Sequence, residues 1–250
     1  MKKILSTLLF TSLALATFAQ QKITLKLAPE LNKPIKYEVI NKMDIEGPQT
    51  VIMDMIMHMN MTYTKVQDSL FNATGKYTYA KIDLDAGMMV ASYDSSKEPT
   101  TEMEKAFATQ FSPLLDNTLT YTMNDLGQIK EVDFPNVSEQ IFDKSSLSSF
   151  GATFPSHPVA IGDSWTATTK LEQMNLDSKS TFTLKEKTAE GYKIELAVNI
   201  TDEGGNSVGK SDGHFIIDPK TGVATTSTTV TTISLQGTSI KTTTDVKLVY

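Results

Sequence analysis

Apolar and polar residues alternate most regularly between Val51 and Tyr63. Every odd-numbered position in this stretch is apolar, and most even-numbered positions are polar. Side chains two residues apart project from the same face of a β-strand, so the pattern predicts one long strand with a continuous apolar face. Methionine fills most of that face, at Met53, Met55, Met57, Met59 and Met61. Thirteen residues would extend about 40 Å, a length that favours a strongly twisted or curled sheet.

The preceding stretch, 34–46, alternates in the same way, and Gly47 with Pro48 supplies a turn. We therefore expect a β-hairpin that closes about Pro48 and places a second apolar row beside the methionines. The expected pairs are Met43 with Met53, Val39 with Met57, Tyr37 with Met59, and Ile35 with Met61.

The remaining alternation predicts further strands separated by glycine, proline and asparagine turns. Together these segments favour a mainly β fold with two short helices, in which about eleven strands form a curved antiparallel sheet or half-barrel with a helical cover. The expected strands are 76–84, 87–93, 117–124, 128–134, 165–171, 180–187, 192–201, 207–218, 223–235 and 240–250. The threonine-rich stretch 225–244 suits exposed faces of a sheet.

Two segments instead predict helices. Met103, Phe107 and Phe111 recur at helical spacing, which predicts a helix over 99–111 that ends at Pro113. Asn136, followed three residues later by Glu139, has the spacing of a helix cap and predicts a second helix over 136–148.

The first residues have the pattern of a cleavable signal peptide. Lys2 and Lys3 precede an apolar run that is too short to span a bilayer, and Thr17 and Ala19 provide small residues before a cleavage point. We expect residues 1–19 to be removed and the protein to be periplasmic or secreted. No cysteine is present to accept a lipid anchor.

Residues 20–250 are then expected to form a single β-rich domain. The segment 151–164, which contains Pro155 and Pro158, is the best internal boundary. Two similar halves, 20–150 and 158–250, are an alternative, because each begins with an aromatic-bearing strand, although chance would explain so loose a similarity equally well.

Composition excludes several classes of function. The formal net charge is −6, and arginine and cysteine are both absent. An acidic chain without arginine is a poor candidate for a nucleic-acid-binding protein. No later segment is apolar enough for a transmembrane helix. The sequence also lacks the HExxH, GxSxG and phosphate-loop patterns, so we expect neither an enzyme nor a bound cofactor.

The methionine face is the best candidate site. Methionine is flexible and polarizable, which suits an irregular or varied apolar partner. We therefore expect non-catalytic binding of a lipid-like or other apolar small molecule. The alternatives are a structural or protein-interaction module in which the methionines are ordinary core, and copper(I) binding, although His58 would project from the opposite face. The candidate ligand-binding residues are Tyr37, Val39, Met53, Met55, Met57, Met59, Met61, Phe107 and Phe111.

Three features together resemble a family of uncharacterised secreted proteins common in Bacteroidota. They are the export signal, the tyrosine strand followed by the methionine strand, and the segment PVAIGDSW at 158–165. The resemblance covers most of the mature chain and implies no known activity. The order of strands and helix also resembles the half-barrels of bacterial lipoprotein carriers, in which a curved sheet with a helical lid holds acyl chains. That second resemblance implies an architecture and carries no binding residues.

Overall fold

The computed structural model describes residues 22–67, 69–137, 142, 147, 150–171, 175–235 and 237–249. The predicted signal peptide, 1–19, therefore lies outside the described residues, and cleavage and export remain predictions.

Twelve antiparallel strands form one sheet in the order β6-β5-β3-β2-β1-β12-β11-β10-β9-β8-β7, and β4 pairs with β3 off this path. The expected mainly β class and antiparallel sheet are confirmed. The strands are β1 Ile35–Glu46, β2 Val51–Gln67, β3 Leu70–Asp85, β4 Val90–Asp94, β5 Leu119–Asn124, β6 Ile129–Asp133, β7 Ser164–Leu171, β8 Leu176–Lys187, β9 Tyr192–Thr201, β10 Ser207–Ile217, β11 Ala224–Leu235 and β12 Thr238–Val249.

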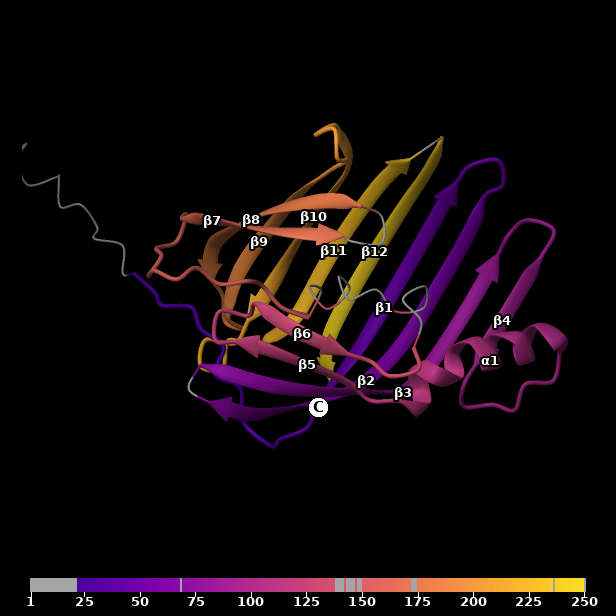
Figure 1. Cartoon of the computed structure of the whole chain (residues 1–250), viewed down its shortest axis with the longest axis horizontal. Coiled ribbons are helices and arrows are strands. Elements are labelled where there is room, and N and C mark those ends of the chain that lie inside the picture. The colour runs from indigo at the N-terminus through magenta and orange to yellow at the C-terminus, as the bar shows by residue number, and fades with distance from the viewer. Residues whose placement is uncertain are drawn as a thin grey trace, which may run out of the picture.

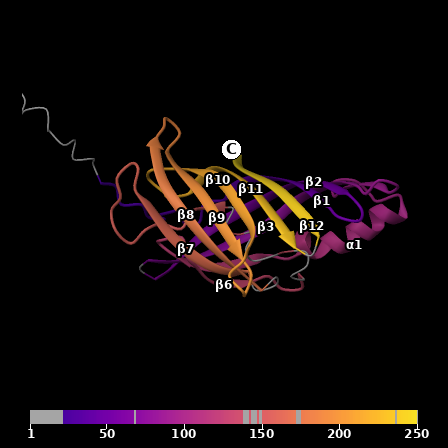
Figure 2. The ribbon, with the colours of Figure 1, turned by 90° about the horizontal axis from the view of Figure 1, so that it is seen from above.

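The strands nearest the two ends of the described chain meet inside the sheet. Lys36 of β1 lies opposite Val249 of β12, and the pairing continues to Glu46 and Ser239. The main path of the sheet ends at β6 and β7, which follow one another in sequence. The sheet is curved, so one of its faces is concave (Figures 1 and 2). We call residues 134–163, which join the two edges, the connector.

The β1–β2 hairpin has the predicted register. Met43 lies opposite Met53, Val39 opposite Met57, Tyr37 opposite Met59 and Ile35 opposite Met61. The alternation in sequence therefore identified both the strands and the residues that share the concave face.

The first predicted helix is present, but its bounds differ. Helix α1 runs from Glu102 to Asp116. Thr101 caps it, because its side chain accepts a hydrogen bond from the Glu104 backbone while the Glu104 carboxylate accepts one from the Thr101 backbone. Pro113 lies inside the last turn rather than ending the helix. Because proline has no backbone N–H, Pro113 removes one hydrogen bond from the last turn of α1.

The prediction of two short helices needs correction, since α1 is the α-helix of the described residues. Much of the second predicted helix, 136–148, falls on 138–141 and 143–146, which lie outside those residues. Asn136 does not have the extended conformation of a helix cap. Its φ is 60°, in the left-handed region that asparagine tolerates in turns.

The core lies on the concave face, under the connector and the segment before β1. Leu25, Leu27, Phe154 and Val159 are all buried there. Ile23 pairs with Val159 through two backbone hydrogen bonds of 2.7 and 2.9 Å. Phe154 donates its backbone N–H to Leu126 in the turn between β5 and β6. These contacts fix the connector across one end of the concave face.

Candidate functional site

The concave face divides into a packed part and a more exposed part. At the packed part, the connector supplies aromatic rings: Phe150 meets Tyr37 edge-on at 5.6 Å between ring centroids, and Phe134 stacks on Tyr77 at 6.4 Å. Nearer the turns that follow β1 and β11, three rows of residues cross the sheet and are mostly half-buried. We call them the open rows, and they comprise Met55, Asn41, Thr244, Thr229, Gly213, Leu196 and Phe182; Met53, Met43, Thr242, Thr231, Ser211, Val198 and Ser180; and Val51, Ile45, Ile240, Ile233, Gly209, Ile200 and Ser178.

This division cuts the methionine face in two. Met59 and Met61 have no exposed surface, and Tyr37 and Val39 beside them are also buried. Met53, Met55 and Met57 are half-buried and pack against the edge of the core. Of the predicted ligand-binding residues on the hairpin, only these three present side-chain surface to a ligand in this conformation.

The predicted helical residues lie beside the open rows. Phe111 stacks on Tyr93 of β4 at 6.5 Å, and Phe107 lies 6.4 Å from the same ring. Phe111 is buried and Phe107 is half-buried. Tyr93 pairs with Ile82, and Ile82 pairs with Met55, so α1 covers β3 and β4 beside the methionines.

Neutral polar side chains occupy the middle of the open rows, between the methionines and the apolar residues of β8 and β9. Thr244 donates a hydrogen bond of 2.7 Å from Oγ1 to Oδ1 of Asn41. Thr231 donates one of 2.9 Å from Oγ1 to Oγ of Ser211. The sequence pattern does not predict these residues as part of a site, because a threonine-rich stretch such as 225–244 also suits ordinary exposed faces of a sheet. That Thr244 lies opposite Asn41, and Thr231 opposite Ser211, becomes visible only when the strands are paired.

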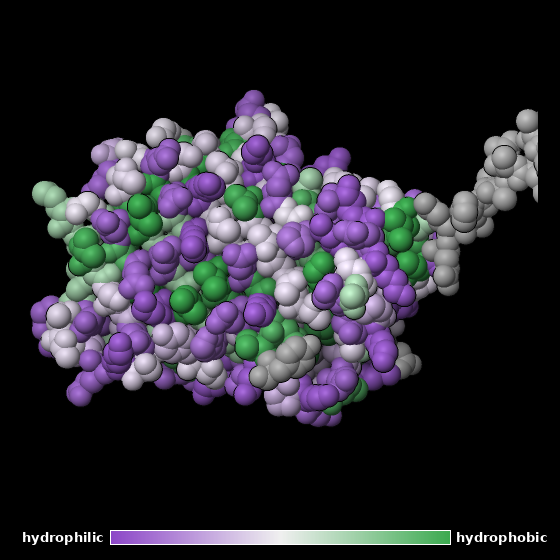
Figure 3. All heavy atoms as spheres, turned by 180° about the vertical axis from the view of Figure 1, so that it is seen from behind, coloured by the Kyte–Doolittle hydropathy of each residue, from purple (hydrophilic) through white to green (hydrophobic). Residues whose placement is uncertain are grey.

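The opposite, convex face carries the charged residues of these strands. His58 lies there, 3.5 Å from a carboxylate oxygen of Glu38 and 4.9 Å from the ring of Tyr79. The face seen from behind is predominantly polar, with hydrophobic residues scattered over it (Figure 3). His58 is therefore kept from the methionines by the sheet itself. Among the residues that the structure describes, no group of three histidine or acidic side chains could hold a metal ion.

Buried tyrosines surround the packed end of the methionine row. Tyr121 donates a hydrogen bond of 3.1 Å to the sulfur of Met61, and Tyr37 donates one of 3.1 Å to the carbonyl of Ala224. Burial raises the pKa of Tyr63 to about 12 and raises the pKa values of Tyr37 and Tyr121 well above their usual range. These hydroxyls stay protonated and act as neutral hydrogen-bonding groups.

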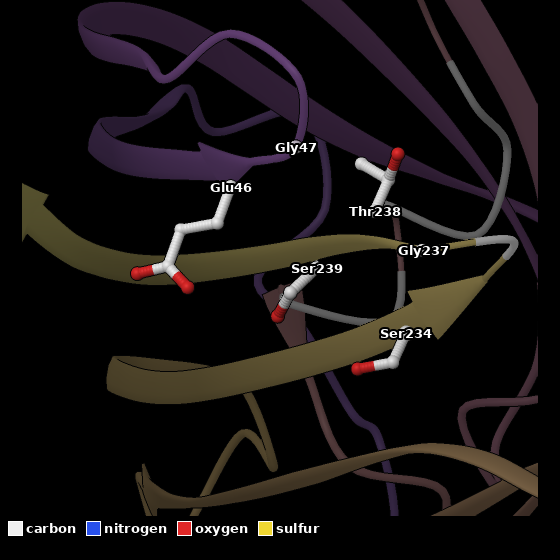
Figure 4. Close-up of a pocket in the computed structure, with 6 residues that line it drawn as sticks. All are labelled: Glu46, Gly47, Ser234, Gly237, Thr238 and Ser239. Atoms are coloured by element: carbon white, nitrogen blue, oxygen red, sulfur yellow. The ribbon is translucent and has the colours of Figure 1, made fainter.

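Two surface hollows lie away from the methionines, although the second also includes Leu196 and Gly213 of the open rows. One, of about 480 Å³, is formed at the turns after β1 and β11 by Glu46, Gly47, Ser234, Gly237, Thr238 and Ser239 (Figure 4). The other, of about 460 Å³, involves mainly convex-face residues of β8 to β11, including Lys193, Glu195, Asp212 and His214. Glu195 is already paired with Lys185 at 3.0 Å. Neither hollow contains a predicted ligand-binding residue.

Comparisons with known proteins identify the fold more clearly than the function. Residues 135–244 match a family model described as "Family of unknown function (DUF6263)". A search of curated proteins found no match. No helix among the described residues is both long and apolar enough to cross a membrane.

Among solved structures, the chain resembles one titled "Lipid-protein interactions in lipovitellin", with 10% sequence identity and a TM-score of 0.56. The alignment covers 88% of this chain and 25% of that one, so this chain matches a quarter of the lipovitellin chain. A putative outer membrane lipoprotein-sorting protein domain from Vibrio parahaemolyticus aligns with 8% identity over 85% of each chain, at a TM-score of 0.28. A DUF1329 family protein from Desulfovibrio piger aligns with 6% identity over 87% of each chain, at a TM-score of 0.29. The lipovitellin likeness supports a shared fold.

Proposed function

We propose that the open rows bind an apolar small molecule, such as an acyl chain, without catalysis. The observation that carries this proposal is the continuation of the methionine row beyond the core, where Met53, Met55 and Met57 stay half-buried on a concave face. Ordinary core methionines would be covered like Met59 and Met61. Flexible thioether side chains can adapt to a chain of varied shape, and apolar contact with them removes surface from water.

The fold is compatible with this function. Lipovitellin, whose structure is titled for its lipid–protein interactions, shares the fold but little sequence. This likeness alone gives no ligand, because one fold can serve many functions. The proposal therefore depends on the half-buried methionines of this chain.

Native mass spectrometry of the protein purified from its own host is the direct test. We expect a bound mass in the range of a lipid, released by organic solvent. Replacing Met53, Met55 and Met57 together by glutamine should lower the affinity for the released molecule about tenfold or more, because the face becomes polar at similar side-chain size. Replacement of the same three residues by leucine should preserve binding.

A matched control places the same glutamines on the convex face, at Ile40, Ile52 and Ile56. Ile52 and Ile56 alternate with the three methionines on β2, and Ile40 lies opposite Ile56 on β1. This variant should keep its bound mass. Wild-type protein that is empty when purified, and that binds no molecule from a lipid extract of its host, would support the alternative in which the methionines are plain core.

A further inference from the structure

Charge is absent from the open rows. In the rows defined above, no aspartate, glutamate, lysine or histidine occurs on β1, β2 or β8 to β12, and the charged residues that alternate with these rows lie on the convex face. Asp245 and Lys42, for example, follow the inner residues Thr244 and Asn41 in sequence and project outwards. Among the residues that the structure describes, these rows therefore offer a ligand no charged side chain.

Hydrogen-bonding groups are nevertheless present in these rows, and Asn41 is the one residue there that carries an amide. The Oδ1 atom of Asn41 accepts the hydrogen bond from Thr244, and this leaves the two N–H groups of the Asn41 amide with no partner among the described residues. Asn41 is half-buried and lies directly opposite Met55. The amide therefore presents donors beside the methionines, at the border between the apolar and the hydroxyl-bearing parts of the face.

We infer that the ligand is an uncharged amphipathic molecule: an acyl chain with an ester, amide or alcohol group, which Asn41 and Thr244 bind while the chain lies along Met53, Met55 and Met57. This inference rests on the proposed function and narrows it. A neutral carbonyl or hydroxyl oxygen can accept a hydrogen bond from the Asn41 amide. A carboxylate or phosphate in the same place would lose hydration without contacting a positively charged side chain of these rows. Removing an unpaired ion from water costs far more free energy than removing a neutral group.

The test compares ligands with the same acyl chain and different polar groups. Long-chain fatty alcohol, methyl ester and free fatty acid at neutral pH compete against an uncharged fluorescent apolar probe on the full mature chain. We expect the alcohol and the ester to displace the probe at concentrations at least about tenfold lower than the acid. Equal displacement by all three would overturn the inference and leave the proposed function standing. Displacement by none would overturn both.

Two variants test the role of Asn41. Asn41→Lys supplies the missing positive charge and should reverse the preference, so that the acid displaces the probe about tenfold better than the ester. The control Ile40→Lys adds the same charge one residue away on the convex face, opposite Asp245, and should leave the preference unchanged. Circular dichroism establishes that both variants are folded. A folded Asn41→Lys protein that still prefers the ester would contradict the placement of the polar group.

Discussion

Neighbouring methionines on one strand have different roles because their surroundings differ. Met59 has no exposed surface and would touch any side chain added at Gly75, where a Cβ would lie 3.2 Å from its sulfur. Met53, six residues earlier on the same face, is half-buried. A single residue type therefore provides both core packing and adaptable surface.

Truncation should separate these two roles. We expect Met59→Ala to lower the free energy of unfolding by about 2–5 kcal/mol, because it leaves a cavity in the core. Met53→Ala should lower it by about 1 kcal/mol or less, since part of that side chain is already in water. Urea denaturation followed by circular dichroism measures both values. Equal losses for the two variants would show that the division of the methionine row is wrong.

Helix α1 depends on the capping interactions of Glu104. Hydrogen bonds from Thr101 and Thr100 hold the pKa of this exposed carboxylate at about 2, against an ordinary value of 4.5. A carboxylate with a lowered pKa in the folded state contributes stability that is present above its unfolded pKa. That contribution is lost as the pH falls through the folded value.

We therefore expect part of the stability of the protein to disappear between about pH 4.5 and about pH 2. Glu104→Gln keeps an acceptor for the cap but cannot titrate, so its stability should change less with pH over this range. Glu102→Gln, in the same turn and paired with Lys105, serves as the control. Urea midpoints measured across the acid range provide the comparison, and parallel curves for wild type and Glu104→Gln would refute the assignment.

At the level of elements, the sequence predicted strands well where large apolar residues alternate and less well where small ones do. The strand predicted over 76–84 begins at Leu70, because Ala73 and Gly75 are small yet fully inside the sheet, opposite Tyr63 and Met61. The strand predicted from Gly87 begins at Val90, since Gly87 has a φ of 74° and forms the turn.

The candidate site was only partly predictable for a related reason. Alternation identifies which residues share a face, and it placed Met53 to Met61 together correctly. It cannot identify the part of that face that a distant segment covers. Phe134 and Phe150 of the connector decide this, by packing on Tyr77 and Tyr37. The sequence does not predict Asn41 as a site residue, because its hydrogen-bonding partner, Thr244, lies far away in sequence.

For the whole molecule, the buried tyrosines predict sensitivity to alkali. Tyr63 has a pKa of about 12, raised by burial from 10.0, and burial also raises the pKa values of Tyr37, Tyr77 and Tyr121. Groups whose pKa is raised by folding contribute stability that is complete below the unfolded pKa and is lost as the pH rises towards the folded value. We expect unfolding to set in between about pH 10 and about pH 12.

Tyrosinate absorbance recorded together with circular dichroism tests this expectation. Ionisation of the buried tyrosines should coincide with loss of the β signal in one steep step. Tyr63→Phe should shift that step to higher pH, whereas Tyr79→Phe on the convex face should not. Ionisation of all eight tyrosines in a single shallow transition near pH 10, with the β signal intact, would contradict the burial of this cluster.

The pairing of β1 with β12 has a consequence for assembly. A ribosome makes β1 before β2 to β11 and makes β12 after them, so β1 and β12 can pair only after all the intervening strands exist. Closing so large a loop is entropically costly, and folds dominated by distant pairings form slowly. Until β1 and β12 pair, the first hairpin exposes its methionine face to water, and a chaperone or an apolar ligand could cover that face during folding.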